Sequence, residues 1–153
     1  MKNYMKLSNG IAVVTMLFTS MSHAADGMVE IKSAHSVKDT ITRFESAARE
    51  RGLTIFARID HAAGAQKIGK TLRPTELLIF GNPQGGTPLM ECAQTAGIDL
   101  PLKALAWEDA AGQVWLGYND PQYLTHRHGA KECGPVAGNL RKALDGLAGA
   151  ASK

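Results

Sequence analysis

The chain has 153 residues, of which 44% are hydrophobic and 20% are charged, a size and composition typical of one globular domain. Its 17 lysines and arginines against 14 acidic residues give a formal net charge of +3. No basic stripe accompanies this small excess, so the composition argues against a nucleic-acid-binding protein.

The first 24 residues have the order of a secretory signal peptide. Lys2 and Lys6 precede an apolar run that ends at Phe18, and the small residues Ser22 and Ala24 then occupy the two positions that a signal peptidase requires. The run is far shorter than the roughly 20 residues of a membrane-spanning helix. We therefore expect cleavage after Ala24, a periplasmic location and no membrane span in the mature chain, which would keep 15 basic and 14 acidic residues.

The remainder predicts one domain over residues 25–148, followed by a flexible Gly/Ala tail at 149–153. We find no internal repeat. The expected elements, in chain order, are a strand at 29–32, a helix from 37 to 51, a strand at 53–60, a short helical pattern from 61 to 72, a strand at 77–80, a helix from 88 to 96, a hairpin of 102–107 and 114–118, a short helix from 121 to 128, and a last helix from 135 to 147.

Capping residues and apolar spacing support these elements. Ser36 followed by Asp39 is typical of a helix N-terminus, and Gly52 ends the apolar pattern that begins there. Alternation from Leu53 to Asp60 predicts a half-buried strand with Ile55, Ala57 and Ile59 on one face. The continuous apolar run from Leu77 to Phe80 predicts a strand covered on both faces.

Two helix N-termini that contain proline, together with the mixed order of strands and helices, indicate the fold class. Thr87-Pro88 and Asp120-Pro121 each combine an N-cap residue with a proline in the first turn, which favours a helix that begins there. Strands and helices alternate irregularly and end in a hairpin and two helices. This order indicates an α+β domain rather than a doubly wound α/β one.

Three short motifs at strand ends carry a family resemblance. They are Phe80-Gly81-Asn82-Pro83, Asp99-Leu100-Pro101-Leu102-Lys103 and Tyr118-Asn119-Asp120-Pro121. With the frame from about Leu53 to Gly129, they resemble the domain of unknown function family 302, whose members have no assigned activity. The resemblance implies a curved, mostly antiparallel sheet packed against a long helix, similar to the TATA-binding-protein fold, and a homodimer. Fold alone does not carry function.

Five polar residues are candidates for one ligand-binding site: His61, Asn82, Lys103, Asp120 and His128. His61, Asn82 and Asp120 each stand where a strand meets a turn or helix, and such positions tend to assemble binding sites. We expect all five to converge on one concave surface that holds a small polar or anionic ligand. The alternative is that each only reverses the chain, caps a helix or, for Lys103, lies along Trp107.

Cys92 and Cys133 are the only cysteines, and an isolated pair in an exported chain favours a disulfide. The competing interpretations are a redox site, which lacks a C-x-x-C spacing, and a soft-metal site that includes Met90. Neither cysteine belongs to the pattern of the family that the chain resembles. A structural disulfide is our prediction.

A small-ligand binding or sensing module is the function that we expect first, because no nucleophile, base and oxyanion set is recognisable. One alternative is an enzyme that uses His61 with Asp60 or Asp120 as an acid–base pair. The other is a periplasmic metal- or haem-handling protein, with His61 and His128 as ligands from different elements. The sequence predicts no metal site outright and identifies no cofactor.

Overall fold

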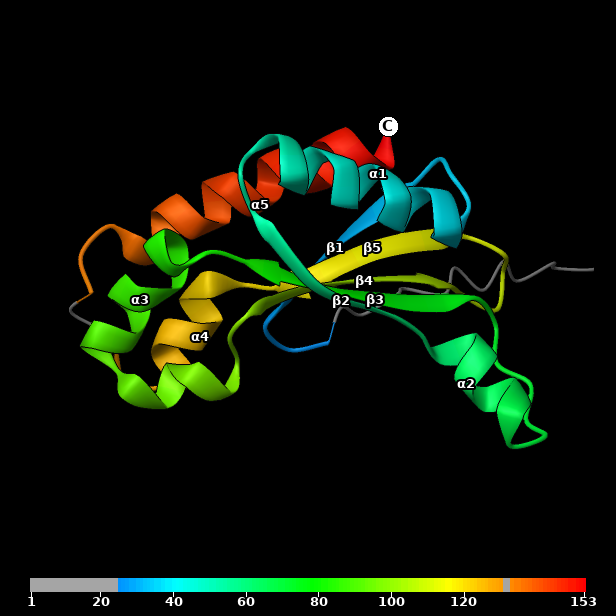
Figure 1. Cartoon of the computed structure of the whole chain (residues 1–153), viewed down its shortest axis with the longest axis horizontal. Helices are drawn as coiled ribbons and strands as arrows, with labels where there is room; N and C mark the ends of the chain where they lie inside the picture. The colour runs from blue at the N-terminus through cyan, green and yellow to red at the C-terminus, as the bar shows by residue number, and fades with distance from the viewer. Residues whose placement is uncertain (1–24, 131–132) are drawn as a thin grey trace, which may run out of the picture.

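The computed structural model describes residues 25–130 and 133–153, so the predicted signal peptide lies outside the described residues. The domain is an α+β structure with one sheet and two long helices on one of its faces (Figure 1). Its elements are β1 (Met28–Ser33), α1 (Val37–Glu50), β2 (Thr54–Asp60), α2 (His61–Lys67), β3 (Thr75–Gly81), α3 (Pro83–Cys92), the 3-10 helix η1 (Gln94–Ile98), β4 (Leu102–Glu108), β5 (Val114–Asn119), α4 (Pro121–Arg127) and α5 (Val136–Ser152).

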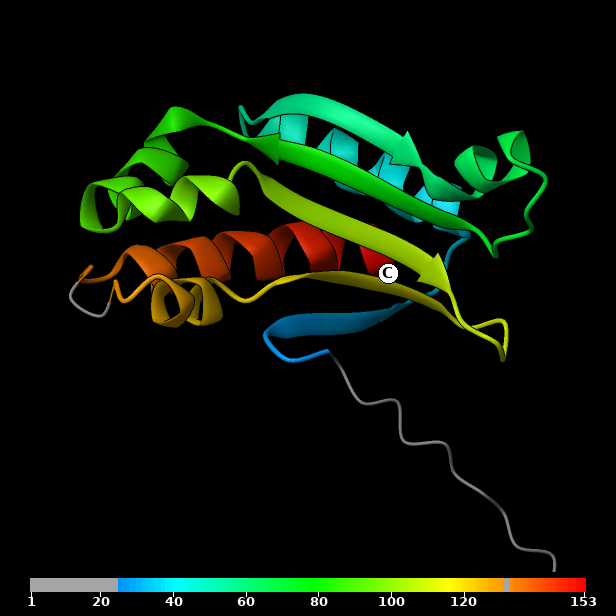
Figure 2. The ribbon, with the colours of Figure 1, turned by 90° about the horizontal axis from the view of Figure 1, so that it is seen from below.

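The five strands form an antiparallel sheet in the order β1-β5-β4-β3-β2. The first two strands of the chain are therefore the two edges, and α1 crosses the sheet to join them (Figures 1 and 2). The turn from Asp109 to Gly112 closes the β4–β5 hairpin, as predicted. This curved antiparallel sheet under long helices is the fold class that the sequence indicated.

The main core lies between the sheet and the pair α1 and α5. Ser36 starts α1 by accepting a hydrogen bond from the Asp39 N–H at 3.1 Å, and its hydroxyl donates to the Asp39 carboxylate at 2.8 Å. The apolar stripe of α1 then meets β3, where the rings of Phe44 and Phe80 pack edge to face with centroids 5.0 Å apart. Leu144 and Leu147 of α5 complete this cluster.

A smaller apolar cluster lies beyond the end of the sheet. Leu89 and Ala96 are fully buried there, against Ala130 and the disulfide between Cys92 and Cys133. The Cα atoms of the two cysteines are 5.7 Å apart, inside the usual range for a disulfide, and the predicted bond is confirmed. This bond links the end of α3 to the segment before α5 and closes a loop that contains η1, the β4–β5 hairpin and α4.

Within residues 25–130 and 133–153, no helix covers the other face of the sheet. The pairings of Ile79 with Lys103, Leu77 with Leu105 and Thr75 with Trp107 place these side chains on one face, away from buried Leu78 and Phe80. At the two ends of this open face, α2 on one side and α3 with α4 on the other extend past the sheet (Figure 1). In the described part of the chain, no helix is long and apolar enough to cross a membrane.

A bulge corrects the predicted face of the second strand. Ile55 pairs with Phe80 and Ala57 with Ile79, so Phe56 is the extra residue between them. Ile55 therefore faces the helices, while Ala57 and Ile59 face the open side. The simple alternation that put all three on one face is wrong.

Three predicted boundaries also differ from the structure. The short helix α2 ends at Lys67 rather than near Leu72. Helix α3 begins at Pro83 rather than at Pro88, because Asn82 supplies the N-cap earlier in the chain. The expected tail after residue 148 is wrong: α5 continues to Ser152, and Ala151 is fully buried against the core.

Candidate ligand-binding pocket

A cavity of about 600 Å³ opens where the main core meets the smaller cluster. Phe80, Leu144 and Leu147 contribute its inner wall from the main core, and Met90 and Leu140 contribute from the smaller cluster. Residues of α3 and α5 line the cavity beyond the end of β3. Its volume lies within the usual range of small-molecule sites.

The junction of β3 with α3 forms one wall of this pocket. Asn82 follows the strand, and its Oδ1 accepts a hydrogen bond from the Gly85 N–H at 2.8 Å, which fixes the first turn of α3. Gly85 and Gly86 then bring backbone, without side chains, to the cavity. A Cβ atom at Gly86 would lie 3.5 Å from Leu100 Cδ1, an ordinary contact, so the glycine here leaves open space rather than relieving a clash.

Among the described residues, none of those that line the pocket is charged. Its polar side chains include the amides of Asn82, Gln84 and Asn139, which stand among aliphatic, aromatic and proline residues. Within the described residues, the only side-chain hydrogen bond of these three amides is the Asn82 cap, so its Nδ2 group remains free to donate. The pocket therefore offers apolar contact with a few neutral hydrogen-bonding groups.

Of the five residues predicted to share a site, Asn82 is the one that lines this pocket. Lys103 lies on the open face of the sheet, next to Ile79. Its Nζ donates to the backbone oxygens of Asp99 at 2.8 Å and Pro101 at 2.9 Å. These two bonds hold the turn before β4, which is a structural role for the ammonium group.

His128 ends α4 and makes two contacts with the segment before β4. Its Nε2 lies 2.6 Å from Asp99 Oδ2 and its Nδ1 lies 3.1 Å from Thr95 Oγ1. Arg127 pairs with the other oxygen of Asp99 at 2.9 Å. The carboxylate partner of His128 is thus Asp99, a residue that the sequence interpretation did not include as a partner.

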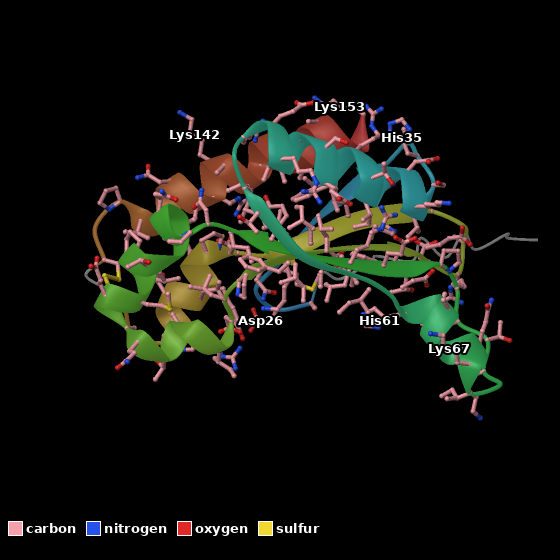
Figure 3. The ribbon with its side chains drawn as sticks, in the orientation of Figure 1. Asp26, His35, His61, Lys67, Lys142 and Lys153 are labelled. Atoms are coloured by element: carbon pink, nitrogen blue, oxygen red, sulfur yellow. A yellow bond between two sulfur atoms is a disulfide. The ribbon has the colours of Figure 1, made fainter. Side chains whose placement is uncertain are left out.

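His61 lies at the opposite end of the sheet from the other four candidates. Asp60, just before it, pairs with Glu76 near the start of β3, whereas Asn82 follows the end of that strand. At a rise of about 3.3 Å per residue, β3 separates these two ends by about 20 Å. Figure 3 shows His61 at the start of α2, remote from α4. The expected convergence of all five residues, and a metal held jointly by His61 and His128, are therefore wrong.

Asp120 belongs to a polar chain between β5, α4 and α5. It caps α4 through the Gln122 N–H at 2.9 Å and pairs with Arg141 at 2.7 Å. Arg141 also binds Asp145, which accepts a short hydrogen bond from the buried Tyr118 hydroxyl. Burial, followed by this bond to Asp145, raises the pKa of Tyr118, and the same bond lowers the pKa of Asp145.

The sequence interpretation missed the character of the pocket. The residues that line it from the last helix, such as Leu140 and Leu144, fall in the range 135–147 that the sequence predicts only as a helix. A usable signal in the sequence is the absence of charged residues from Leu77 to Met90. Among the described residues, no group of three or more His, Cys, Asp or Glu side chains is placed to hold a metal ion.

A family model described as "Domain of unknown function DUF302" matches residues 29–147. The match covers most of the chain, so this protein belongs to that family. A solved structure of the same family, an uncharacterized conserved protein from Bacillus stearothermophilus, superimposes with a TM-score of 0.74 at 18% identity and covers 84% of this chain and 100% of that one. At this identity the likeness supports the fold alone.

Curated relatives from Brucella are more similar in sequence. A protein of Brucella suis biovar 1 (strain 1330) named "Fluoride-specific ion channel FluC 1" is 48% identical over 125 residues, which is 81% of this chain and 49% of that protein. A Brucella melitensis protein named "Fluoride-specific ion channel FluC 2" matches at the same identity over 46% of its length. The chain thus spans about half the length of the curated relatives that it matches.

Proposed function

We propose that this protein is a binding or sensing module for a small, uncharged and largely apolar molecule, which occupies the pocket between α3 and α5. The observation that carries the proposal is a cavity of about 600 Å³ whose lining, as far as residues 25–130 and 133–153 form it, includes no charged residue. Ligand pockets of this size are usually apolar with a few polar groups that fix orientation. Asn82 would supply such a group through its free Nδ2 donors.

The lining determines the class of ligand. An ionised ligand would lose its hydration on entering an apolar cavity, and no countercharge among the described lining residues would replace it. A neutral molecule loses little hydration free energy on entering the cavity, and it gains free energy by covering apolar surface. This proposal replaces the polar or anionic ligand that the sequence suggested.

The test uses two fluorescent probes of similar size, one without charge and one with a negative charge. N-phenyl-1-naphthylamine is neutral, and 8-anilinonaphthalene-1-sulfonate is an anion. We expect saturable enhancement of the neutral probe and much weaker binding of the anion. Ala143→Phe should reduce the affinity for the neutral probe about tenfold or more, because Ala143 lines the pocket and is solvent-exposed, so a ring there would enter the opening.

Ala150→Phe is the matched control. Ala150 is also an exposed alanine of α5, and it lies outside the pocket lining. The control should bind the probe like the wild-type chain. Equal probe binding by all three chains, or no saturable binding at all, would contradict the proposal.

The name of the Brucella relatives suggests fluoride as another ligand. Binding a small anion requires N–H donors or cations directed at it, and this pocket instead presents mostly carbon. We therefore assign ligand binding to this chain, and we do not assign it the ion conduction that the name of those longer proteins describes.

Acid–base chemistry at His128 is the second candidate function. The favouring observation is the alignment of the Thr95 hydroxyl, the His128 ring and the Asp99 carboxylate, in which Asp99 orients the ring. Hydrolysis of p-nitrophenyl acetate by the purified chain tests it. We expect a rate above that of free imidazole which both His128→Gln and Thr95→Val abolish; a rate that survives either change would exclude this candidate.

We also propose export to the periplasm, with cleavage after Ala24. The Cys92–Cys133 disulfide supports this proposal, since such bonds persist in oxidising compartments. Intact mass of the protein from a periplasmic extract checks it, and a species that still carries Met1 would contradict it. Self-association as a homodimer stays a prediction, for which light scattering of the purified chain gives the test.

A further inference from the structure

The segment from His61 to Pro74, here named the α2 arm, extends past the end of the sheet opposite to the pocket (Figure 1). No residue of α2 is buried, and every residue from Gln66 to Pro74 is exposed. Two large aliphatic side chains stand in this exposed stretch: Ile68 is 74% exposed and Leu72 is 47% exposed. Apolar side chains of this size gain little from such positions unless something outside the fold covers them.

The α2 arm is also purely basic. Lys67, Lys70 and Arg73 alternate with the two aliphatic residues, and no acidic residue occurs from His61 to Thr75. Within the described residues, neither lysine side chain has an ion pair or a hydrogen bond, and the Arg73 Nε donates to the Glu108 backbone oxygen at 3.0 Å. Three cations therefore flank Ile68 and Leu72 in the sequence, and of these Arg73 also interacts with the carboxylate of Asp109 in the β4–β5 turn.

Backbone hydrogen bonds fix the tip of the α2 arm. After α2, the Gly69 N–H bonds to Gln66 O at 3.0 Å and the Lys70 N–H bonds to Ala65 O at 3.0 Å. This is the Schellman arrangement, with Gly69 at a φ of 70°. The turn presents Ile68 and its neighbouring lysines from a defined backbone rather than from an unstructured loop.

We propose that the α2 arm docks the protein on a lipid bilayer that contains anionic headgroups. Ile68 and Leu72 would enter the boundary between headgroups and acyl chains, and Lys67, Lys70 and Arg73 would contact lipid phosphates. Charge complementarity selects this occupant, because a bilayer offers anionic groups directly above hydrocarbon, in the same order as the cations and aliphatic side chains of the arm. Two α2 arms facing each other would instead bring like charges together.

The docking proposal is independent of the ligand pocket. The pocket lies beyond the end of β3, and the α2 arm lies before its start. One length of the sheet separates them, so a docked protein would keep the pocket accessible. The arm variants below are accordingly expected to leave neutral-probe binding unchanged.

Co-sedimentation with lipid vesicles tests the proposal on the isolated protein. We expect binding to vesicles of phosphatidylglycerol and phosphatidylcholine, no binding to phosphatidylcholine alone, and weakening as salt is added. Ile68→Ser with Leu72→Ser should lower the partition coefficient about tenfold or more. Lys67→Gln with Lys70→Gln should also lower it about tenfold.

Two control variants make the same chemical changes elsewhere. Ile98→Ser removes an isoleucine that is also 74% exposed, but at the pocket end of the sheet. Lys38→Gln with Lys142→Gln removes two exposed charges from the helix layer; Figure 3 shows Lys142 and Lys67 on opposite sides of the molecule. All variants share the wild-type N-terminus, so any contribution from that segment cancels.

Both controls should bind vesicles like the wild-type chain. Absence of vesicle binding, equal binding to neutral vesicles, or equal losses in arm and control variants would overturn the proposal. If the wild-type chain ignores vesicles but cross-links to a protein that the arm variants fail to capture, the α2 arm is a protein-docking site and the lipid proposal is wrong.

Discussion

The two ends of the sheet are completed in contrasting ways. At one end, the chain builds α3 and η1 between β3 and β4 and adds α4 after β5, around a second apolar cluster that includes Cys133 of the Cys92–Cys133 bond. Beyond β2 and before β3, it builds only the α2 arm, which buries none of its helix. The first end encloses space, and the second presents side chains to the exterior.

Because of this difference, we expect the pocket end of the domain to be more stable against local opening than the α2 arm. Elements with few buried contacts open at low cost, while those tied to the core open only with the whole structure. The pocket end needs its walls held at fixed positions, which the disulfide and the neighbouring helices supply. The α2 arm has no buried helix residue, so substitutions in it are expected to cost the fold little.

The largest effect should come from the core that both ends share. Phe44→Ala removes a fully buried ring that packs on Phe80, and we expect a loss of about 3–5 kcal/mol in unfolding free energy. Urea unfolding measures it. The control is Phe56→Ala, because Phe56 is 56% exposed at the bulge of an edge strand; a similar loss there would mean that the bulge belongs to the core.

Removing the disulfide should affect the pocket end most. Cys92→Ala with Cys133→Ala is expected to cost about 2–4 kcal/mol, mainly by releasing a constraint on the unfolded chain. Hydrogen exchange should show faster exchange in α3 and η1, with little change in the α2 arm. Uniformly faster exchange throughout the sheet would contradict a role confined to one end.

The polar chain at Tyr118 predicts a dependence on alkaline pH. Because burial and the bond to Asp145 raise its pKa, the folded phenol keeps a proton that an unfolded tyrosine releases above about pH 10. Its contribution to stability is thus complete below about pH 10 and is lost as the pH rises. Tyr118→Phe should be less stable than the wild type at pH 7, by about 1–3 kcal/mol.

The difference in unfolding free energy between the wild type and Tyr118→Phe should decrease above pH 10. Urea unfolding at several pH values measures it. Tyr123→Phe serves as the control, since Tyr123 has no such bond to a carboxylate in the described structure. A gap that stays constant from pH 7 to pH 11 would show that Tyr118 contributes through packing rather than through its proton.

The smallest effect on stability should come from the α2 arm. Ile68→Ser is expected to change the unfolding free energy by about 0.5 kcal/mol or less, because the side chain is already in water. Thermal unfolding gives the measurement. A loss above about 1 kcal/mol would place Ile68 in a packed contact and remove the contrast between the two ends.

Much of the fold follows from local sequence signals. The Ser36 cap, the apolar spacing of α1 and the run at Leu77–Phe80 each specify one element without knowledge of the others. The prediction of an antiparallel sheet came from the resemblance that the three family motifs carry. Two isolated cysteines in a chain with an export signal were sufficient to predict the disulfide.

The errors came from features that depend on the rest of the molecule. The bulge at Phe56 reverses the faces of β2, and nothing in the local alternation marks it. Asn82 and Pro83 displaced the predicted start of α3, because two N-cap and proline combinations compete within a few residues. The small residues after Leu147 resemble a linker by composition, yet they suit a helix packed closely against α1.

The candidate site was less predictable than the fold. The prediction placed polar residues at strand ends in one ligand site. In the structure, Lys103 binds backbone oxygens, Asp120 pairs with Arg141 and His128 contacts Asp99, and the sequence does not reveal these partners. The pocket is formed instead by residues of β3, α3 and α5, which only the packed structure brings together. Only Asn82 belongs to both the predicted set and the pocket.

The position of β1 has a consequence for how the chain folds. Its hydrogen bonds go to β5, where Glu30 pairs with Gly117, so the first strand made finds its partner only after nearly all the others exist. Closing so long a loop is slow, and chains dominated by distant pairings fold in about milliseconds to seconds. A growing chain must therefore carry its first strand unpaired throughout most of its synthesis, and every nascent chain shorter than about 119 residues lacks one complete edge of its sheet.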